Sequence, residues 1–182
     1  MPFNRRTILK FGLGGAAVLT VGGVGLGLRG TAMRAAPQAL RVLSTRQYSI
    51  LAAIAETLCP GGPGLPDANE VQVAVKVDGV LDTLHPGDAK EFVQALALME
   101  NALVGLAFQG RFSTFSGSSP AVRTAALEGW RTSGLALRRT AFTAVSGLCM
   151  GAYWSDPSTY AHVGYPGPPP LGAAAPGRKR GG

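Results

Sequence analysis

Apolar residues recur at every third or fourth position through much of the chain, which is the period of a helix that buries one face. The first such stretch follows Ser44-Thr45-Arg46-Gln47, a capping box in which Ser44 can accept a hydrogen bond from the Gln47 amide and Gln47 can reach back. Cys59-Pro60-Gly61-Gly62 predicts the end of this helix. Its inward positions have helical spacing and are Tyr48, Leu51, Ala52, Ala55 and Leu58.

Two further helices are predicted between residues 67 and 106. Asp67-Ala68-Asn69-Glu70 is a second capping box, and the valine-rich stretch after it continues to Pro86-Gly87, which we expect to close the segment. A strand is disfavoured here because Asp78-Gly79 would interrupt it. Asp88-Ala89-Lys90-Glu91 opens the next helix in the same way. That helix has the most regular period in the chain, with apolar positions at Phe92, Ala95, Leu96, Met99, Ala102, Leu103 and Leu106.

Two more helices are predicted after a loop at residues 110–119. Ser119-Pro120 fits an N-cap followed by proline at the first helical position, and this helix should end near Gly134. Residues 135–153 form the last predicted helix, with an inward face of Leu137, Phe142, Val145, Leu148 and Cys149. About five helices joined by short loops indicate an all-α fold, a helical bundle with an irregular aromatic and proline-rich strap at its C-terminal end.

The N-terminal segment resembles a twin-arginine export signal, because paired arginines and Leu-Lys precede an apolar run from Phe11 to Leu28. As a helix this run would measure ~27 Å, close to the ~30 Å hydrocarbon core, so a retained membrane anchor is the alternative. Seven of its residues are glycine, which weakens a helix and favours a cleaved signal. Gly30-Thr31-Ala32 offers a small-x-small cleavage site, and Ala35-Ala36 offers a less regular one. The expected export residues are Arg5, Arg6, Leu9 and Lys10.

Charge is concentrated at the two ends of the chain, although the formal net charge is +7. Residues 1–36 carry five basic residues and no acidic one, and residues 178–180 add three basic residues. Between residues 37 and 177, nine basic residues face ten acidic ones. A nearly neutral body has no positive field to attract phosphates, so binding to nucleic acid is disfavoured.

Residues that could catalyse a reaction or hold a cofactor are scarce. The two histidines, His85 and His162, lie far apart, and the sequence has neither the Glu-x-x-His pairs of di-iron bundles nor a Gly-x-Ser-x-Gly elbow. Most carboxylates are expected at helix starts or on solvent-facing sides. We therefore assign no catalytic, cofactor-binding or metal-binding residue. Twin-arginine export carries folded proteins, often with a cofactor bound, so a cofactor is expected in a partner protein.

Cys59 and Cys149 are the only cysteines, and they leave three alternatives open. In an oxidising compartment, a disulfide between them would close a loop of about 90 residues and stabilise the fold by ~4–5 kcal/mol. Two buried apolar thiols are the second alternative. A bond to a partner chain is the third.

Aromatic residues gather near the C-terminus, and four of them fall within residues 153–165 before a proline-rich stretch. Proline restricts the backbone, so such a segment loses little entropy on docking, and Trp and Tyr dominate interface hot spots. The segment is predicted to dock onto another protein. The alternative is that Tyr153 and Trp154 cover the end of the bundle. The candidate interface residues are Tyr153, Trp154, Tyr160, Tyr165, Pro166, Gly167 and Pro168.

Several of these features together resemble one protein family. After the twin arginines come Leu43-Ser44, Tyr48, Leu51, Leu58-x-Pro60, Phe112-x-x-Phe115-Ser116, Arg123, Leu127, Trp130 and Arg139-x-x-Phe142. The most specific motifs are Ala152-Tyr153-Trp154-Ser155-Asp156-Pro157 and Val163-Gly164-Tyr165-Pro166-Gly167-Pro168. In these motifs the chain is similar to the small third subunit of gluconate 2-dehydrogenase-type complexes, over nearly all of residues 1–168.

The resemblance implies a non-catalytic accessory subunit. In such families the small subunit binds a flavin-dependent catalytic subunit of the glucose–methanol–choline type, supplies its twin-arginine signal and supports its maturation and stability. FAD then belongs to the partner, and a membrane-bound cytochrome is a further expected partner. The implied parts are a signal at 1–36, an accessory-subunit domain at 37–168 and a disordered basic tail at 169–182, in a periplasmic protein. A membrane-anchored binding module and a stand-alone exported enzyme are the alternatives.

Overall fold

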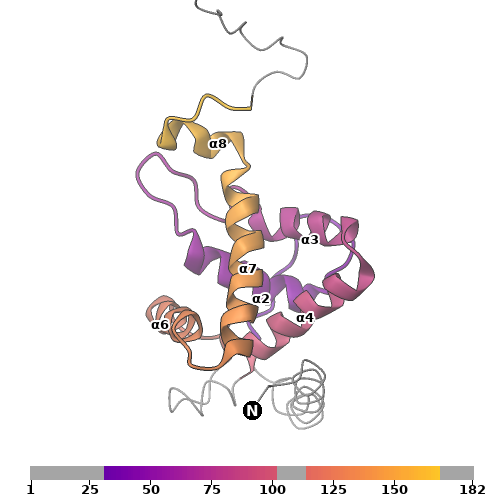
Figure 1. Ribbon diagram of the computed structural model, residues 1–182. Helices are drawn as coiled ribbons and strands as arrows, with labels where there is room; N and C mark the ends of the chain where they lie inside the picture. The colour runs from indigo at the N-terminus through magenta and orange to yellow at the C-terminus, as the bar shows by residue number, and fades with distance from the viewer. Residues whose placement is uncertain (1–30, 102–113, 169–182) are drawn as a thin grey trace, which may run out of the picture.

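The computed structural model describes residues 31–101 and 114–168 (Figure 1). Helices form the regular structure of these residues, and no β-strand is present among them, which confirms the predicted all-α fold. The elements are α2 (Thr45–Leu58), α3 (Val73–Thr83), α4 (Pro86–Glu100), α6 (Pro120–Arg131), α7 (Ala136–Trp154), α8 (Pro157–Tyr160) and the 3₁₀ helix η2 (Ala161–Val163).

Helix α2 is the centre of the bundle and packs against α3, α4, α6 and α7. Its predicted capping box is confirmed: the Gln47 amide donates to Ser44 Oγ at 3.3 Å, and the Ser44 amide donates to Gln47 Oε1 at 2.7 Å. Leu51 and Ile54 have no exposed surface. The core therefore forms around a helix whose start is fixed by its own local sequence.

The second predicted helix starts later than its capping box indicates. The box itself forms, since the Glu70 amide donates to Asp67 Oδ1 at 2.9 Å and the Asp67 amide donates to Glu70 Oε2 at 2.7 Å. Gln72 then adopts a left-handed conformation with φ 56°, which breaks the helical path. Helix α3 begins only at Val73, so the box caps a separate turn.

Helix α4 begins two residues before the predicted capping box. His85 is its N-cap, with Nδ1 accepting from the Gly87 amide at 3.1 Å, and Pro86 occupies the first turn. Pro86 therefore opens this helix, and the prediction that Pro86-Gly87 only closes the preceding segment is wrong. The prediction that this helix runs on to Leu106 is wrong, because α4 ends at Glu100 and Asn101 has an extended backbone with ψ 119°; Ala102, Leu103 and Leu106 themselves lie outside the described residues.

Helices α6 and α7 agree with their predicted positions, and Pro120 does open α6. On α7 the predicted inward positions Val145 and Cys149 are fully buried. The prediction that Leu137 faces inward is wrong, because its side chain is 58% exposed. The adjacent Arg138 turns inward instead, and its guanidinium carbon lies 4.7 Å from the centre of the Trp130 ring.

Two carboxylates are buried, in contrast to the expected solvent-facing positions. Asp78 on α3 accepts the backbone N–H groups of Arg41, Val42 and Leu43 at 2.7–3.1 Å. Glu100, at the end of α4, accepts the amide of Ser116 at 2.8 Å and its hydroxyl at 2.6 Å. These contacts fix the segments before α2 and before α6 onto the bundle.

Candidate partner interface

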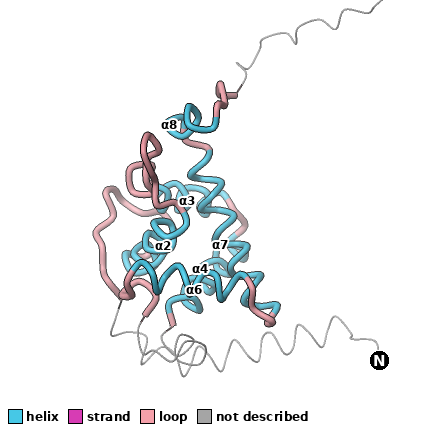
Figure 2. Tube along the Cα trace, turned by 90° about the vertical axis from the view of Figure 1, so that its left-hand side faces the viewer, coloured by secondary structure: helices cyan, strands magenta, loops and turns pink. Residues whose placement is uncertain are grey.

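The segment after α7, residues 155–168, is called the C-terminal strap. It starts with α8, which lies beyond the end of α7 in both views (Figures 1 and 2). Asp156 caps α8 by accepting the Ser158 amide at 2.9 Å, and it also forms an ion pair with Lys76 of α3. The hydrogen bonds from Lys76 and Ser158 lower the pKa of Asp156 to about 2. The carboxylate therefore stays charged at neutral pH and ties the start of the strap to α3.

Contacts within the strap order its aromatic residues. The Tyr160 hydroxyl donates to the Ser155 carbonyl at 2.9 Å, and the Tyr165 amide donates to the Tyr160 carbonyl at 3.0 Å. The two tyrosine rings meet edge to face with centroids 5.0 Å apart. Gly164 and Gly167 have positive φ angles of 66° and 97°, which favour glycine at the two bends. The strap thus has a defined shape without a bound partner.

The predicted interface residues fall into two groups. Trp154 is 38% exposed, Tyr165 is 45% exposed, and Pro166 and Pro168 are also exposed. Tyr160 and Gly167 are partly buried against one another, with the tyrosine ring 3.8 Å from where a Cβ of residue 167 would lie.

Tyr153 does not belong to an exposed interface. It is 2% exposed, and its hydroxyl donates to the Pro66 carbonyl at 2.6 Å. Its ring meets Trp154 edge to face at 4.9 Å. Tyr153 therefore joins the end of α7 to the loop before α3, and its ring packs against Trp154. This position agrees with the alternative in which Tyr153 covers the end of the bundle.

A second exposed surface runs along α7 and was not predicted. Its members are uncharged, exposed and spaced by three or four residues, and we call them the α7 stripe: Thr140, Thr143, Ala144, Gly147, Met150, Gly151 and Trp154. A Cβ added at Gly147 or Gly151 would have no neighbouring atom within 4 Å. The stripe is therefore flat in its middle and ends at Met150 and Trp154, where the strap begins. The absence of charge at this spacing was visible in the sequence.

A sequence model of the gluconate 2-dehydrogenase subunit 3 family matches residues 45–167, from the first residue of α2 to Gly167 of the strap. The chain belongs to this family. The match confirms the resemblance seen in the sequence motifs, and the family is named for a subunit of a dehydrogenase. Comparisons with curated proteins and with solved structures gave no match.

Both cysteines of this subunit 3 family member are free and buried. The disulfide between Cys59 and Cys149 is therefore not formed in the structure, and the choice among the three alternatives stays a prediction. Burial raises the pKa of Cys59 to about 11 and that of Cys149 to about 12. Cys59 Sγ lies 3.6 Å from Met150 Sδ, directly under the α7 stripe. The thiols therefore stay protonated at neutral pH and pack as apolar groups.

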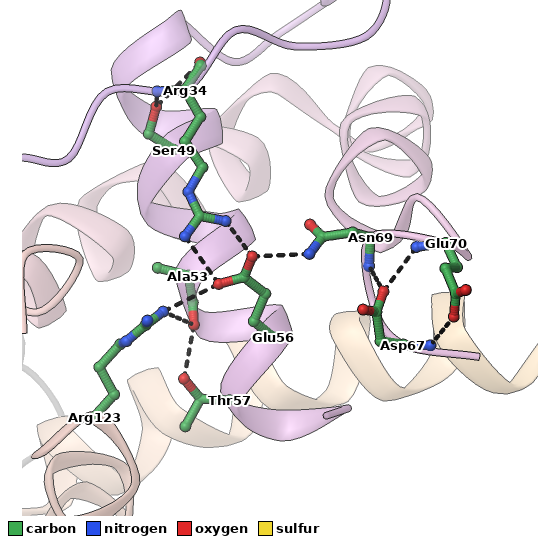
Figure 3. A network of polar contacts seen from close by, with 9 residues as sticks. All are labelled: Arg34, Ser49, Ala53, Glu56, Thr57, Asp67, Asn69, Glu70 and Arg123. Atoms are coloured by element: carbon green, nitrogen blue, oxygen red, sulfur yellow. Dashed lines mark hydrogen bonds and ion pairs between the residues drawn. The ribbon is translucent and has the colours of Figure 1, made fainter. Parts of the chain in front are cut away.

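A polar network on the side of α2 joins distant parts of the chain (Figure 3). Glu56 accepts from the Arg34 guanidinium, from Asn69 Nδ2 at 2.8 Å and from Arg123 at 3.1 Å. Burial raises the pKa of Glu56, but the hydrogen bonds from Arg34, Asn69 and Arg123 outweigh it and lower the pKa to about 2. Arg123 also donates to the Ala53 carbonyl at 3.3 Å. Arg123 is among the family-like residues, and its role here is structural.

One pocket in the described part of the chain has a volume of about 230 Å³ and lies between α2 and residues 68–74. Four of its eight lining residues are alanines. Ligand pockets commonly measure ~300–1,000 Å³, so this one is small for a flavin. Within residues 31–101 and 114–168, no three His, Cys, Asp or Glu side chains gather as a metal site, and no helix has the length and apolar character needed to cross a membrane. The predicted export residues Arg5, Arg6, Leu9 and Lys10 lie outside the described residues.

Proposed function

We propose that this chain is a non-catalytic accessory subunit that binds a flavin-dependent dehydrogenase of the glucose–methanol–choline type. The observation that carries the proposal is the α7 stripe, which is exposed, uncharged and continuous with an ordered aromatic strap in a member of the gluconate 2-dehydrogenase subunit 3 family. In this proposal FAD is held by the partner, and a membrane-bound cytochrome receives the electrons.

The chemistry of the surface suits a protein partner. A helix face on a soluble domain usually carries charged residues, and the stripe has none along four turns of α7. Glycines in its middle let another backbone approach closely, while Met150 and Trp154 supply adaptable and aromatic contacts at its end. The strap has already lost much of its conformational freedom through the Tyr160 and Tyr165 contacts, which lowers the entropy cost of binding.

We further propose that the subunit carries its partner through the twin-arginine pathway to the periplasm. The basis is the Arg5-Arg6 pair followed by Leu9-Lys10 and an apolar run, joined to a domain of the subunit 3 family. Substituting Arg5→Lys and Arg6→Lys together should leave both proteins in the cytoplasm. Unchanged periplasmic activity of the partner in this variant would contradict the escort role.

The docking role is tested by measuring the affinity of the purified subunit for a flavin dehydrogenase encoded beside it. Trp154→Ala and Tyr165→Ala should each weaken binding by about 2 kcal/mol, or about 30-fold in Kd, if they are hot spots. Val80→Ala is the matched control, because Val80 is 39% exposed on α3 and belongs to neither the stripe nor the strap. A lowered melting temperature with unchanged affinity would show that the aromatic residues only cover the bundle.

A further inference from the structure

We infer that residues 34–36 belong to the folded domain and that the export signal is removed on the N-terminal side of Arg34. The inference rests on the proposed export of this chain. The sequence places the domain boundary at residue 37, and the family match begins only at residue 45. Arg34 nevertheless contacts the matched region, at Ser49 and Glu56 of α2.

Backbone and side-chain hydrogen bonds hold the segment 31–36 along its length. The Ala32 amide donates to Ser116 Oγ at 3.1 Å, and the Arg34 amide donates to Ser49 Oγ at 2.9 Å. Arg46 Nε donates to Thr31 Oγ1 at 3.1 Å. Ser116 is itself held by the buried Glu100, so the segment is attached to α2 and to the loop before α6. A cut after Ala32 removes the contacts of Thr31 and Ala32, whereas those of Arg34 stay in the mature chain.

Arg34 makes the most consequential contact of the segment. Its guanidinium binds both oxygens of Glu56, and the two side chains are only 34% and 23% exposed (Figure 3). Glu56 also accepts hydrogen bonds from Asn69 and Arg123, so Arg34 completes a network that joins α2, α6 and the turn before α3. Removing Arg34 would leave a partly buried carboxylate with fewer donors, which is costly.

The exposure of the segment indicates where cleavage can occur. Ala32 and Met33 are exposed, with Met33 at 60%, whereas Arg34 and Ala36 are partly buried and Ala36 packs against the core. A cut after Ala32 releases the signal at an accessible bond and keeps Arg34 in place. A cut after Ala36 would remove every contact described above. The mature chain is therefore expected to begin at Met33.

The experiment expresses the full-length gene in an export-competent host and measures the intact mass and melting temperature of the periplasmic protein. The wild-type mass should correspond to a chain that begins at Met33. Arg34→Met should lower the melting temperature of the mature protein by about 3–8 °C, because the Glu56 network is lost. Arg41→Met is the matched control, since Arg41 pairs with Asp82 at an exposed site and should shift it by less than about 2 °C.

The outcomes separate this inference from the export proposal. A mature chain that begins at Pro37 overturns the inference, and Arg34→Met could then have no effect on the mature protein. Protein that stays in the cytoplasm at full mass contradicts export instead. In that case the inference is judged on the uncut chain, where equal melting temperatures of the Arg34→Met and Arg41→Met variants would overturn it.

Discussion

At the scale of single residues, Glu56 joins three separate parts of the chain through one carboxylate. We predict that Glu56→Gln lowers the free energy of unfolding at pH 7 by about 1–3 kcal/mol, because Arg34 and Arg123 lose their charged acceptor. Glu128→Gln is the control, since Glu128 pairs with Arg131 at an exposed site, where solvent screens the pair, and it should change stability far less than Glu56→Gln does. Urea unfolding followed by circular dichroism measures both.

The stability that the Glu56 carboxylate contributes should depend on pH. The pKa of Glu56 is lowered in the folded state to about 2, from a usual value of 4.5. A depressed folded pKa adds stability above the unfolded pKa, and this stability is lost as the pH falls toward the folded pKa. The difference between wild type and Glu56→Gln should therefore be full above about pH 5 and shrink between pH 4.5 and pH 2. A constant difference over this range would show that Glu56 is not held as a charged acceptor.

At the scale of elements, the start of α3 depends on one strained residue. Gln72 is exposed and adopts φ 56° between the capped turn and the helix. We predict that Gln72→Gly raises the free energy of unfolding by about 0.5–1 kcal/mol, because glycine adopts this conformation without the steric cost of a Cβ. Gln72→Ala keeps the cost and should give no such gain. Equal stabilities of the two variants, measured by thermal unfolding, would contradict a strained junction.

The elements that could be predicted from sequence are those with local signals. The Ser44 capping box and Pro120 at a helix start depend only on neighbouring residues, and both were predicted. His85 was missed as a cap because histidine is a weak capping residue and Pro86-Gly87 also fits a helix end. Asp78 and Glu100 were missed because their partners lie in other parts of the chain. For such residues only the tertiary fold shows what the carboxylate binds.

The candidate interface also contains residues that could be predicted from the sequence and residues that could not. The aromatic composition and the prolines of the strap predicted an interface at Trp154 and Tyr165, whose side chains are exposed. Tyr153 was misplaced because adjacent residues of a helix end point in different directions, and only the contact with Pro66 decides which one is buried. The α7 stripe was not predicted, because helical periodicity of apolar residues indicates the buried face and says little about the exposed one. The opposite face of the same helix is exposed and uncharged and forms the second part of the candidate interface.

At the scale of the whole molecule, the polar network and the exposed stripe lie on different elements of one bundle. The Glu56 network and the segment 31–36 lie at α2 (Figure 3), whereas the stripe follows α7 to the strap, which lies beyond the end of α7 (Figure 1). In our proposal the network holds the base of the export signal, and the stripe and the strap hold the dehydrogenase. In the same proposal, the bundle links the bound partner to the signal within one chain.

This account is tested most directly by the dehydrogenase activity in the periplasm of cells that produce the partner with variants of this subunit. Gly147→Glu places a charge and a side chain in the middle of the stripe, where the fold offers open space. Gly129→Glu makes the same change in α6, also at an open position. We predict that Gly147→Glu abolishes most of the periplasmic activity while Gly129→Glu retains it. Equal activity with both variants would contradict docking through α7.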